Sequence, residues 1–567
     1  MKNFKIDTLK KKLTSIVGPK HTLFGEKETK SYRTGIRIGF GEAVAVVLPG
    51  DLLQFWEVIK LCVSLDKIIL IQAANTGLTG GSTPDGDKYD RDVVIINTLY
   101  LDKLLLLNEG EQVLAFPGAS LYKLEEILDP LDREPHSVIG SSCIGASIVG
   151  GVCNNSGGNL IKRGPAYTEL ALFAQLNSSG QLELINHLGI DLGESPEEIL
   201  QNLQDSNFSL NEISNTEKKT SDNTYKDRIR DFNSKTPSRF NSDKRRLFEA
   251  SGCAGKIAVF AVRLETFLKS KNKKVFYFGS NNTSTLTDIR KNILSKFIEL
   301  PDMTEYMHYS SFDGADKYGK DTFMIIKYLG KSVIPNLFRL KRMFDIFFNY
   351  IPFMPQDIFD IFLQNLSVFL PDHLPSRLRE YRNRFDHYLI IVASDSVIKD
   401  VKYLLNKLCL DKNLSDYFEC TDKEAEDILL HRYVAGLAPK RSKIMNKNES
   451  GEVLALDVAL PRNCEKWYEI IPDLILENSF ESFQMAHFMC MVFHWDFVLK
   501  KGVNAENIKK NILKKLDDLG AKYPAEHNVG HLYKANEDLE CFYKELDPSN
   551  SFNAGIGKLS KNKFYVD

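Results

Sequence analysis

The sequence predicts an α+β protein with several domains. The chain has 567 residues, which is more than one hydrophobic core normally holds. Apolar residues make up 43% and charged residues 26% of the chain, as in ordinary globular proteins. Short strand and helix patterns alternate over residues 42–120, and two runs dense in glycine lie in and just after this region.

The strand and helix units are defined by their apolar period. Residues 43–50 are apolar and end in a turn, as a strand does. Residues 51–66 have the period of a helix, and residues 67–77 form a buried strand that enters a glycine loop. The other predicted units are strands at 91–99, 111–120 and 255–267 and a helix at 121–131.

Changes in composition give the expected domain boundaries. The first domain is expected to span residues 1–268, with the polar segment 200–245 as a surface insertion. Mixed helix and strand patterns at 269–310 and 386–515 predict a second domain. It is interrupted by residues 311–385, which are rich in Phe, Pro and Arg. Residues 516–567 carry turn motifs again and are expected to return to the first domain.

Charge, cysteines and the N-terminal segment exclude several classes of protein. The net charge is −2, so no overall field favours nucleic acid. None of the nine cysteines forms a C-x-x-C pair, which argues against zinc-ribbon and thioredoxin-like proteins and fits a reducing compartment. The N-terminal segment has no apolar core of a signal peptide, and no run of about 18 uncharged apolar residues predicts a membrane-spanning helix.

The two glycine-rich loops are the strongest local signal. The first, QAANTGLTGGSTPDG, spans residues 72–86, and the second spans residues 140–159 and holds six glycines. Small side chains and free backbone N–H groups let such loops surround a pyrophosphate. Neither loop has the Walker A or the G-x-G-x-x-G order. A single loop of this kind is typical of tight turns between packed strands, but two in one domain favour a ligand site.

A series of motifs runs through both loops and continues beyond them: ANTGLTGGS, EPHSVIGSSCIGASIVGGVCNNSGG, RGPAY and SGCAGKIAVFAVRL. This series resembles the FAD domain of the vanillyl-alcohol-oxidase-type flavoproteins. Within them it is most similar to the quinone-dependent D-lactate dehydrogenases of bacterial respiratory chains, and the resemblance covers nearly the whole chain. It implies a two-subdomain FAD-binding domain, an α/β cap domain and a mainly helical membrane-contact subdomain inserted in the cap.

The resemblance also implies how FAD is held. The first loop wraps the pyrophosphate, the second lines the adenosine and isoalloxazine path, and the start of a later strand meets the flavin. The implied residues are Ala73, Ala74, Asn75, Thr76, Gly77, Gly81, Ser82, Gly140, Ser147, Gly157, Gly255 and Val259. Some relatives tether FAD through a histidine, but His21, His136 and His187 lack a matching motif, so noncovalent FAD is expected.

Histidines cluster in two C-terminal segments. AHFMCMVFHWD contains His487 and His494, and YPAEHNVGHLYK contains Glu526, His527 and His531. A single histidine is more often a core or surface residue, but clusters beside a carboxylate favour acid–base chemistry. Oxidation of a 2-hydroxy acid needs a base for the hydroxyl proton and a cation for the carboxylate, tasks that suit His and Arg.

The resemblance assigns roles within these clusters. Related D-2-hydroxyacid dehydrogenases carry an H-x6-H segment and an E-H-G segment, which imply that His527 is the base. His487, His494 and Glu526 match the relatives' metal ligands, or they form a metal-free hydrogen-bonded pocket. The residues between the two histidines differ from the relatives' pattern and Asn528 replaces the glycine, so a tightly held metal is not expected.

A further segment, LLHRYVAG, resembles the one whose arginine binds the substrate carboxylate. The resemblance places this role on Arg432, with Asp457 in the strand that follows. A surface ion pair is the simpler alternative for an arginine, but the motif favours the functional assignment.

Residues 331–384 combine many phenylalanines with two basic groups. Such a segment is typical either of a helical subdomain with buried Phe or of helices that lie in a membrane interface. Prolines and aspartates within it exclude a spanning helix, and the resemblance favours contact with an anionic phospholipid surface. The basic residues are Lys331, Arg339, Lys341, Arg342, Arg377, Arg379, Arg382 and Arg384, with Lys440, Arg441, Lys443 and Lys447 expected at the same face.

These observations predict a flavoenzyme that oxidises D-lactate to pyruvate and passes electrons to membrane quinone. It is expected to be a peripheral protein on the cytoplasmic face of the bacterial inner membrane, with no nucleic-acid partner. Two alternatives stay open: a dehydrogenase of another D-2-hydroxy acid, and a noncatalytic membrane scaffold that keeps the flavin fold.

Overall fold

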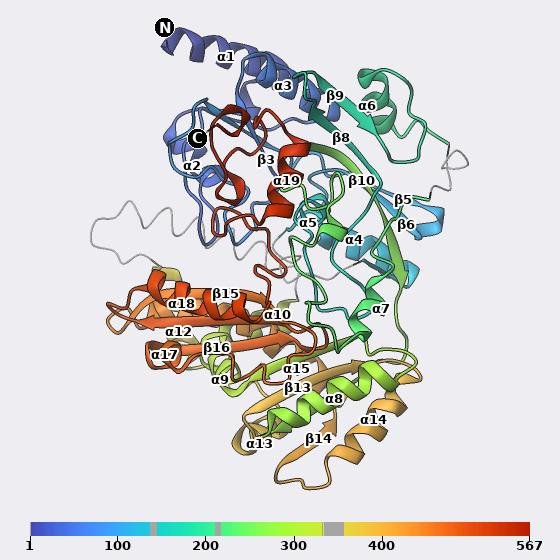
Figure 1. The fold of residues 1–567 in the computed structure, drawn as a ribbon, viewed down its shortest axis with the longest axis vertical. Helices are drawn as coiled ribbons and strands as arrows, with labels where there is room; N and C mark the ends of the chain where they lie inside the picture. The colour runs from blue at the N-terminus through green and yellow to red at the C-terminus, as the bar shows by residue number, and fades with distance from the viewer. Residues whose placement is uncertain (1, 137–144, 210–216, 331–332, 334–356, 567) are drawn as a thin grey trace.

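The computed structural model describes residues 2–136, 145–209, 217–330, 333 and 357–566. Helices and three β-sheets make up these residues, which confirms the predicted α+β class. In Figure 1 the N-terminal and C-terminal segments lie together in the upper half, and the third sheet with its helices forms the lower half.

The first sheet has four strands in the order β1-β2-β4-β3, of which β2, β4 and β3 are parallel. Every residue of β2 and β4 is buried, which explains their continuous apolar sequence. The strands are β1 (Thr22–Leu23), β2 (Ala45–Val47), β3 (Ile68–Gln72) and β4 (Val93–Asn97). The helix α3 (Leu52–Ser64) packs against them and begins at Asp51, whose side chain accepts a hydrogen bond from the Gln54 N–H.

The second sheet is antiparallel, in the order β5-β6-β10-β8-β9, and β7 also pairs with β10. It shares a hydrophobic cluster with the first sheet, in which the Phe55 ring of α3 lies 4.5 Å from the Phe260 ring of β10. Its strands are β5 (Leu104–Leu107), β6 (Gln112–Ala115), β7 (Arg133–Pro135), β8 (Ala171–Leu176), β9 (Leu182–Asn186) and β10 (Ala258–Leu268). The helices beside the first two sheets are α1 (Lys2–Val17), α2 (Glu26–Arg33), α4 (Leu121–Leu128), α5 (Ile148–Cys153) and α6 (Pro196–Asp205), whereas α7 (Tyr225–Arg230) packs into the core of the third sheet.

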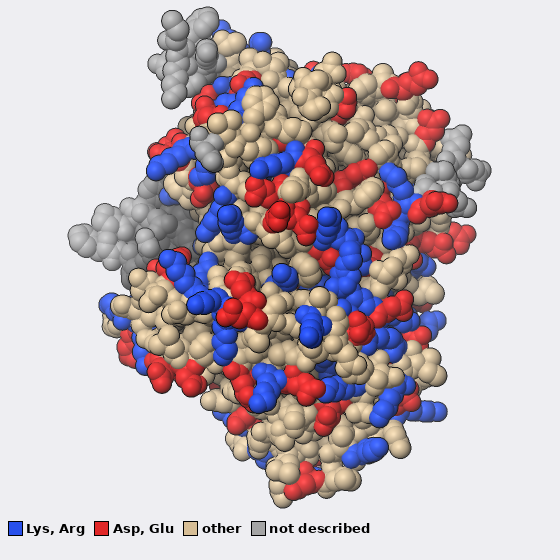
Figure 2. Space-filling model, in the orientation of Figure 1, with Lys and Arg blue, Asp and Glu red and all other residues tan. Residues whose placement is uncertain are grey.

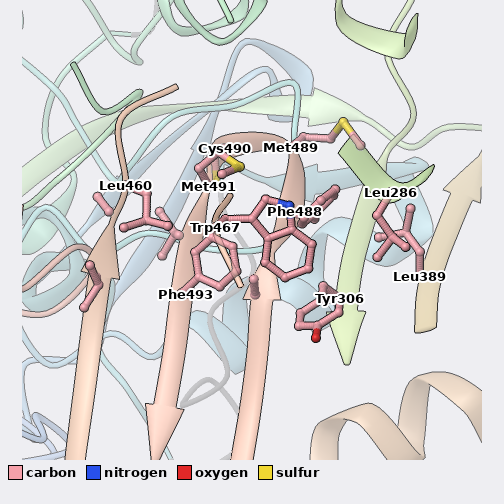
Figure 3. Close-up of a cluster of buried hydrophobic side chains, with 14 of the residues drawn as sticks. Leu286, Tyr306, Leu389, Leu460, Trp467, Phe488, Met489, Cys490, Met491 and Phe493 are labelled. Carbon is pink, nitrogen blue, oxygen red and sulfur yellow. The ribbon is translucent and has the colours of Figure 1, made fainter. Parts of the chain in front are cut away.

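The third sheet has seven antiparallel strands in the order β14-β11-β13-β12-β16-β17-β15. One of its faces carries an aromatic core with Tyr306, Trp467, Phe488 and Phe493 (Figure 3). The strands are β11 (Lys274–Ser280), β12 (Met303–His308), β13 (His387–Ala393), β14 (Ser415–Glu419), β15 (Ser450–Ala459), β16 (Ser479–His487) and β17 (Val492–Lys500).

Helices cover both faces of the third sheet. The face with the aromatic core packs against α8 (Thr283–Lys296), α14 (Val397–Leu408) and α18 (Ala505–Asp518). The other face packs against α9 (Tyr309–Tyr318), α10 (Lys320–Leu329), α13 (Ser376–Arg384), α15 (Asp422–Val434) and α16 (Ala438–Met445). The remaining helices of this half are α12 (Ile358–Ser367) and α17 (Asp473–Glu477).

The helices α9, α10, α12 and α13 form an insertion between the neighbouring strands β12 and β13. Several apolar side chains on α10, on α12 and just after α12 are exposed, among them Phe362 at 61% and Phe369 at 84%. In the part of the chain that the structure describes, no helix combines the length and apolarity needed to cross a bilayer.

The arginines of α13 are not the free basic surface that the sequence predicted. Each forms ion pairs with carboxylates of the protein: Arg377 with Glu424, Arg379 with Asp316 and Asp372, Arg382 with Asp313, and Arg384 with Glu380 and Asp416. Arg441 is likewise buried between Asp321 and Asp360. The expectations for Lys331, Arg339, Lys341 and Arg342 lie outside the described residues.

The C-terminal segment returns to the first sheet after α19 (Glu537–Leu546). The Ile69 N–H donates to the Ser551 carbonyl at 2.8 Å, and the Asn553 N–H donates to the Ile69 carbonyl at 2.9 Å. Acidic and basic side chains are intermingled over the face shown in Figure 2, in keeping with the small net charge.

Candidate active site

The hairpin of β16 and β17 places two histidines on one face of the third sheet. His487 pairs with Val492, and His494 lies two residues further along β17, so both side chains point to the same side. Their ring centroids are 5.1 Å apart. The predicted histidine cluster therefore forms at the end of the hairpin.

Two carboxylates on the neighbouring strands face these histidines. Glu305 of β12 lies opposite His487, and its Oε1 is 2.6 Å from His487 Nδ1. Asp457 of β15 lies opposite His494, with Oδ1 3.6 Å from His494 Nδ1. The row Glu305, His487, His494 and Asp457 thus crosses four strands of the sheet.

The loop after α18 carries Glu526 and His527 to this row. The Ala525 N–H donates to the Asp457 carbonyl at 3.1 Å, and the Glu526 N–H donates to Asp457 Oδ2 at 2.8 Å. The loop also requires Gly530, whose φ is +54° and where a Cβ would overlap the Thr79 carbonyl oxygen. This segment therefore joins the glycine loop of residues 72–86 to the catalytic row, which consists of Glu305, His487, His494 and Asp457.

Glu526 lies at the centre of the cluster. Its Oε2 is 3.2 Å from His487 Nε2 and 3.6 Å from His494 Nε2. Its Oε1 accepts a hydrogen bond from Arg239 Nη2, which also donates to the Gly158 carbonyl at 2.6 Å. Arg239 is only 3% exposed, although the polar segment around it was expected at the surface, because its charge is neutralised by Glu526 inside the protein.

Burial and neighbouring charges set the protonation states. Burial alone would lower the pKa of His487, but the carboxylates of Glu305 and Glu526 raise it to about 10. Burial would raise the pKa of Glu526, but Arg239 and His487 hold it far below its ordinary value. Burial lowers the pKa of His494 to about 4. Near neutral pH, His487 is therefore a cation, Glu526 an anion and His494 neutral.

His527 and Asp457 form a dyad suited to proton abstraction. Asp457 Oδ2 is 2.6 Å from His527 Nδ1, which leaves Nε2 for another partner, and the His527 side chain is 33% exposed. Burial would lower the pKa of His527, but Asp457 outweighs it and raises the pKa. A carboxylate that orients one ring nitrogen while the other meets the substrate is the usual arrangement of a general base.

Of the two other predicted site residues, Arg432 lies at the catalytic cluster and His531 lies at the first glycine loop. Arg432 lies in the last turn of α15, a helix that begins with a capping box between Thr421 and Glu424. The Nη2 atom of Arg432 is 2.8 Å from Glu305 Oε2. It therefore reaches the cluster. The contacts of His531 are instead with the first glycine loop, since its Nε2 is 2.9 Å from the Thr83 carbonyl oxygen. This hydrogen bond gives His531 a position on the loop rather than beside the base.

The first glycine loop has the features of a cofactor cradle. Asn75 adopts φ +53°, and its side chain links the Thr34 carbonyl to Ser82 Oγ, with distances of 2.9 and 2.7 Å. No atom would lie within 4 Å of a Cβ added to Gly77. At Gly145, on the second loop, the nearest atom would be the Cβ of Ala74 at 3.9 Å. Ala73, Ala74, Thr76 and Gly81 belong to the same first loop.

The predicted cofactor residues of the second loop and of the start of β10 differ in what surrounds them. Ser147 caps α5 by accepting a hydrogen bond from the Gly150 N–H at 3.0 Å. At Gly157 an added Cβ would lie 2.6 Å from Glu526 Oε1, so this glycine lies directly against the catalytic cluster. Gly255 adopts φ +78°, and Val259 is paired with Phe173 inside the sheet with its side chain in the core. Gly140 lies outside the described residues.

Two observations indicate that the residues around the two glycine loops fit FAD. One glycine on each loop leaves open space: a Cβ added to Gly77 would have no atom within 4 Å, and one added to Gly145 would have only Ala74 Cβ, at 3.9 Å. In addition, Asn553 Oδ1 and Asn155 Oδ1 are buried with no hydrogen-bond partner among the described residues, which leaves acceptors for a polar ligand. Asn553 connects the two sides, because its Nδ2 donates to the Gly81 carbonyl at 2.9 Å and the Ala254 carbonyl at 2.7 Å.

His487, His494 and Glu526 also have the donor set of a divalent metal site. One ligand atom from each lies within 4.8 Å of the others. The hydrogen bond from Glu305 to His487 Nδ1 is the kind that orients a metal-bound histidine. In the structure, however, Glu305 already pairs with Arg432 and His487, Glu526 pairs with Arg239 and His487, and Asp457 pairs with His527.

Two members of the cluster were missed by the sequence analysis. Glu305 is the single carboxylate in the buried strand MTEYMH, and this isolated charge was the available signal. Arg239 lies in a polar segment with no local pattern that separates it from the neighbouring basic residues. Its role depends on contact with Glu526, 287 residues away in the sequence, which no local pattern reveals.

Solved structures share this fold at low sequence identity. A structure of p-cresol methylhydroxylase with substrate bound has a TM-score of 0.58 and 11% identity, covering 98% of this chain and 97% of that one. Alkyldihydroxyacetonephosphate synthase also has a TM-score of 0.58 and 11% identity, covering 96% of this chain and 84% of the other. The chain therefore has the fold of these two proteins, which confirms the predicted fold of the vanillyl-alcohol-oxidase type.

Sequence relatives define the family within this class. Quinone-dependent D-lactate dehydrogenases are 50% identical in Haemophilus influenzae and in Escherichia coli, over 99% and 97% of this chain and 100% and 96% of theirs. That of Corynebacterium glutamicum is 40% identical over 97% of this chain and 96% of its own. The family described as D-lactate dehydrogenase, membrane binding, matches residues 275–565. The chain belongs to the quinone-dependent D-lactate dehydrogenase family.

Proposed function

We propose that this protein oxidises D-lactate to pyruvate and passes the two electrons to a membrane quinone. The observation that carries the proposal is the His527–Asp457 dyad beside Glu526, which itself touches Gly157 of the cofactor loop. A base for the substrate hydroxyl therefore lies next to the cradle that fits FAD. The family to which the chain belongs supports the substrate and the electron acceptor.

Each residue of the site has its own role in the proposed reaction. Bound FAD supplies the two-electron acceptor for the hydrogen on carbon 2 of D-lactate. His527 takes the hydroxyl proton at Nε2, while Asp457 holds Nδ1 and stabilises the resulting imidazolium. Arg432 binds the substrate carboxylate from α15, and His487, His494 and Glu526 form the polar wall of the site. The products are pyruvate and, after electron transfer, quinol.

We propose that FAD is bound without a covalent link. The cradle holds it through backbone groups of Ala73 to Gly77, Gly81, Ser82 and the second loop, and His136 and His187 have other positions: His136 is buried and His187 Nδ1 is 2.8 Å from Glu249 Oε1. Acid precipitation of the purified protein should release all flavin into the supernatant. Yellow colour that stays in the pellet would show a tether.

Attachment to the membrane is part of the proposal. The protein is expected to bind peripherally to the cytoplasmic face of the inner membrane, on an anionic phospholipid surface. The family description includes membrane binding, and the helical insertion exposes apolar side chains. These are Tyr328, Leu329, Phe362, Leu366, Val368 and Phe369.

Anaerobic titration of the yellow protein with D-lactate tests the proposed function. D-lactate should bleach the flavin absorbance and yield one pyruvate per flavin, L-lactate should not, and a short-chain quinone should restore the colour. Faster bleaching by a bulkier D-2-hydroxy acid would identify that acid as the substrate. Failure of every 2-hydroxy acid would instead favour a noncatalytic scaffold.

A further inference from the structure

We propose that Arg37 binds the carboxylate of the substrate alongside Arg432, so that a 2-hydroxy acid is held between a cation of the FAD-binding domain and the base His527. This inference rests on the proposed oxidation of D-lactate. Neither the sequence motifs nor the family resemblance drew attention to Arg37, which lies in the turn between α2 and β2.

The turn that carries Arg37 is fixed on the first glycine loop. Its ends meet through the bridge between Thr34 and Phe40 and the hydrogen bond from the Gly35 N–H to the Gly39 carbonyl at 2.8 Å. Gly39 has φ +97°, and a Cβ there would overlap Thr83 Oγ1. Close packing of this kind leaves the backbone of Arg37 little freedom.

The side chain of Arg37 reaches across to the catalytic row. Its Nη1 is 3.8 Å from Oδ1 of Asp496, which lies on β17 two residues after His494 and therefore on the same face of the sheet. Asp457, whose Oδ2 is 2.6 Å from His527 Nδ1, is paired with His494 and lies on that same face. Arg37 and the base thus border the same space from opposite domains.

Arg37 is the most exposed of these three arginines, since the exposed fraction of the side chain is 38% for Arg37, 14% for Arg432 and 3% for Arg239. Arg239 is bound to Glu526 and the Gly158 carbonyl, and Arg432 is 2.8 Å from Glu305. The contact of Arg37 with Asp496 is longer than a hydrogen bond, and its side chain is 38% exposed. A guanidinium with free N–H groups can bind a carboxylate at two points.

The chemistry of the substrate fits this position. In a 2-hydroxy acid the carboxylate is bonded to the carbon that carries the hydroxyl, so a cation must lie close to the base that takes the hydroxyl proton. Asp496 would repel an incoming carboxylate on its own. Arg37 offsets that charge while the site is empty of substrate and then exchanges its loose contact with Asp496 for the substrate carboxylate.

Two substitutions of Arg37 and a neutral substrate test the inference. Flavin reduction is measured by stopped flow with D-lactate and with D-lactamide, in which an amide replaces the carboxylate. Arg37→Met should weaken the apparent Kd for D-lactate roughly 10- to 100-fold and leave reduction by D-lactamide nearly unchanged. Arg37→Lys should recover part of the loss. The control Arg384→Met removes an arginine of α13 that pairs with Glu380 and Asp416 and not with the site, and it should match the wild type with both compounds.

An equal loss with D-lactate and D-lactamide would show that Arg37 acts only on the structure, and a wild-type Kd in Arg37→Met would remove it from the site. Oxalate binding, followed by the change in flavin absorbance, separates this inference from the proposed function because it needs no turnover. If D-lactate fails to reduce the wild type, weaker oxalate binding by Arg37→Met still supports a carboxylate site, and unchanged oxalate binding overturns it.

Discussion

Glu526 is the residue at which the cofactor cradle and the catalytic row meet. Its carboxylate contacts Arg239, His487 and His494, and it fills the space that a side chain at Gly157 would need. The glycine at 157 is therefore required by a neighbouring carboxylate and not by backbone conformation. The resemblance predicted both residues but assigned Gly157 only to the cofactor.

Gly157→Ala should slow flavin reduction by D-lactate. The new methyl group would lie 2.6 Å from Glu526 Oε1, and Glu526 cannot withdraw without losing Arg239 or His487. A tenfold loss corresponds to about 1.4 kcal/mol, and we expect at least about that much. The control is Gly50→Ala, where the nearest atom to a Cβ would be Gln54 Oε1 at 3.6 Å. Equal rates in the two variants would contradict the contact.

Removal of divalent metal should leave activity intact. His487 has both ring nitrogens near carboxylates, Nδ1 at 2.6 Å from Glu305 and Nε2 at 3.2 Å from Glu526, and the charges of the cluster balance without an ion. The measurement is the flavin reduction rate after dialysis against a strong chelator, together with elemental analysis. Loss of turnover that Zn²⁺ or Mn²⁺ restores would establish His487, His494 and Glu526 as ligands.

At the scale of elements, the hairpin β16–β17 and the loop after α18 build the site from segments that the sequence identified separately. The histidine spacing predicted that His487 and His494 act together, and strand alternation explains why. Pairing with Glu305 and Arg239 was not predictable, because it depends on which strands and loops become neighbours. The polar segment of Arg239 was assigned to the surface for the same reason: polarity does not show that a charge has a buried partner.

The helical insertion shows again that a charged sequence pattern does not reveal which charges are paired within the protein. The basic residues of α13 suggested attraction to anionic lipid, but Asp316, Glu424 and other carboxylates already pair with them. Their replacement by Gln is therefore expected to disturb local packing more than membrane attachment. Among the described residues, the exposed apolar side chains at and after α12 are the better candidates for membrane contact.

Phe362→Ser combined with Phe369→Ser should reduce sedimentation with anionic vesicles. These side chains are 61% and 84% exposed, so their replacement removes apolar contact with lipid at little cost to the fold. Flavin reduction by D-lactate should remain at the wild-type rate, and quinone reduction in vesicles should fall with binding. The matched control is Tyr403→Ser with Leu410→Ser, which removes exposed apolar groups from another surface. Equal sedimentation of both double variants would reject α12 as a membrane contact.

At the scale of the whole molecule, three sheets surround one reaction site. The first two hold the glycine cradle, and the third supplies the catalytic row through four adjacent strands. The sequence predicted the class and five of the ten strands of the first two sheets, because the apolar runs of β2, β3, β4, β6 and β10 are uninterrupted. The strand order of the third sheet could not be predicted, since the insertion of α9 to α13 separates its neighbouring strands β12 and β13 in the sequence.

The fold should lose stability in mildly acidic solution. Burial lowers the pKa of His308 and His431 to about 3 and that of His373 and His387 to about 4. The unfolded chain binds these protons near pH 6.5, so the contribution of these histidines is complete above that pH and is lost as the pH falls towards 4. Urea unfolding should give a free energy of unfolding that falls from pH 6.5 to 4.5, and that also falls from pH 7 to 8, because the unfolded chain releases the proton that His487 keeps in the folded state. A constant value across the acidic range would contradict the neutral burial of these histidines.

The account depends most on His527 as the base that starts the oxidation. Stopped-flow reduction of the bound flavin by D-lactate, compared between the wild type and His527→Ala under anaerobic conditions, tests it directly. The variant should retain FAD and the folded structure, because the Asp457 carboxylate still accepts the Glu526 N–H. Its reduction rate should fall on the order of 10²- to 10⁴-fold, the usual cost of removing a general base. Reduction of the His527→Ala flavin at a rate near that of the wild type would contradict the account.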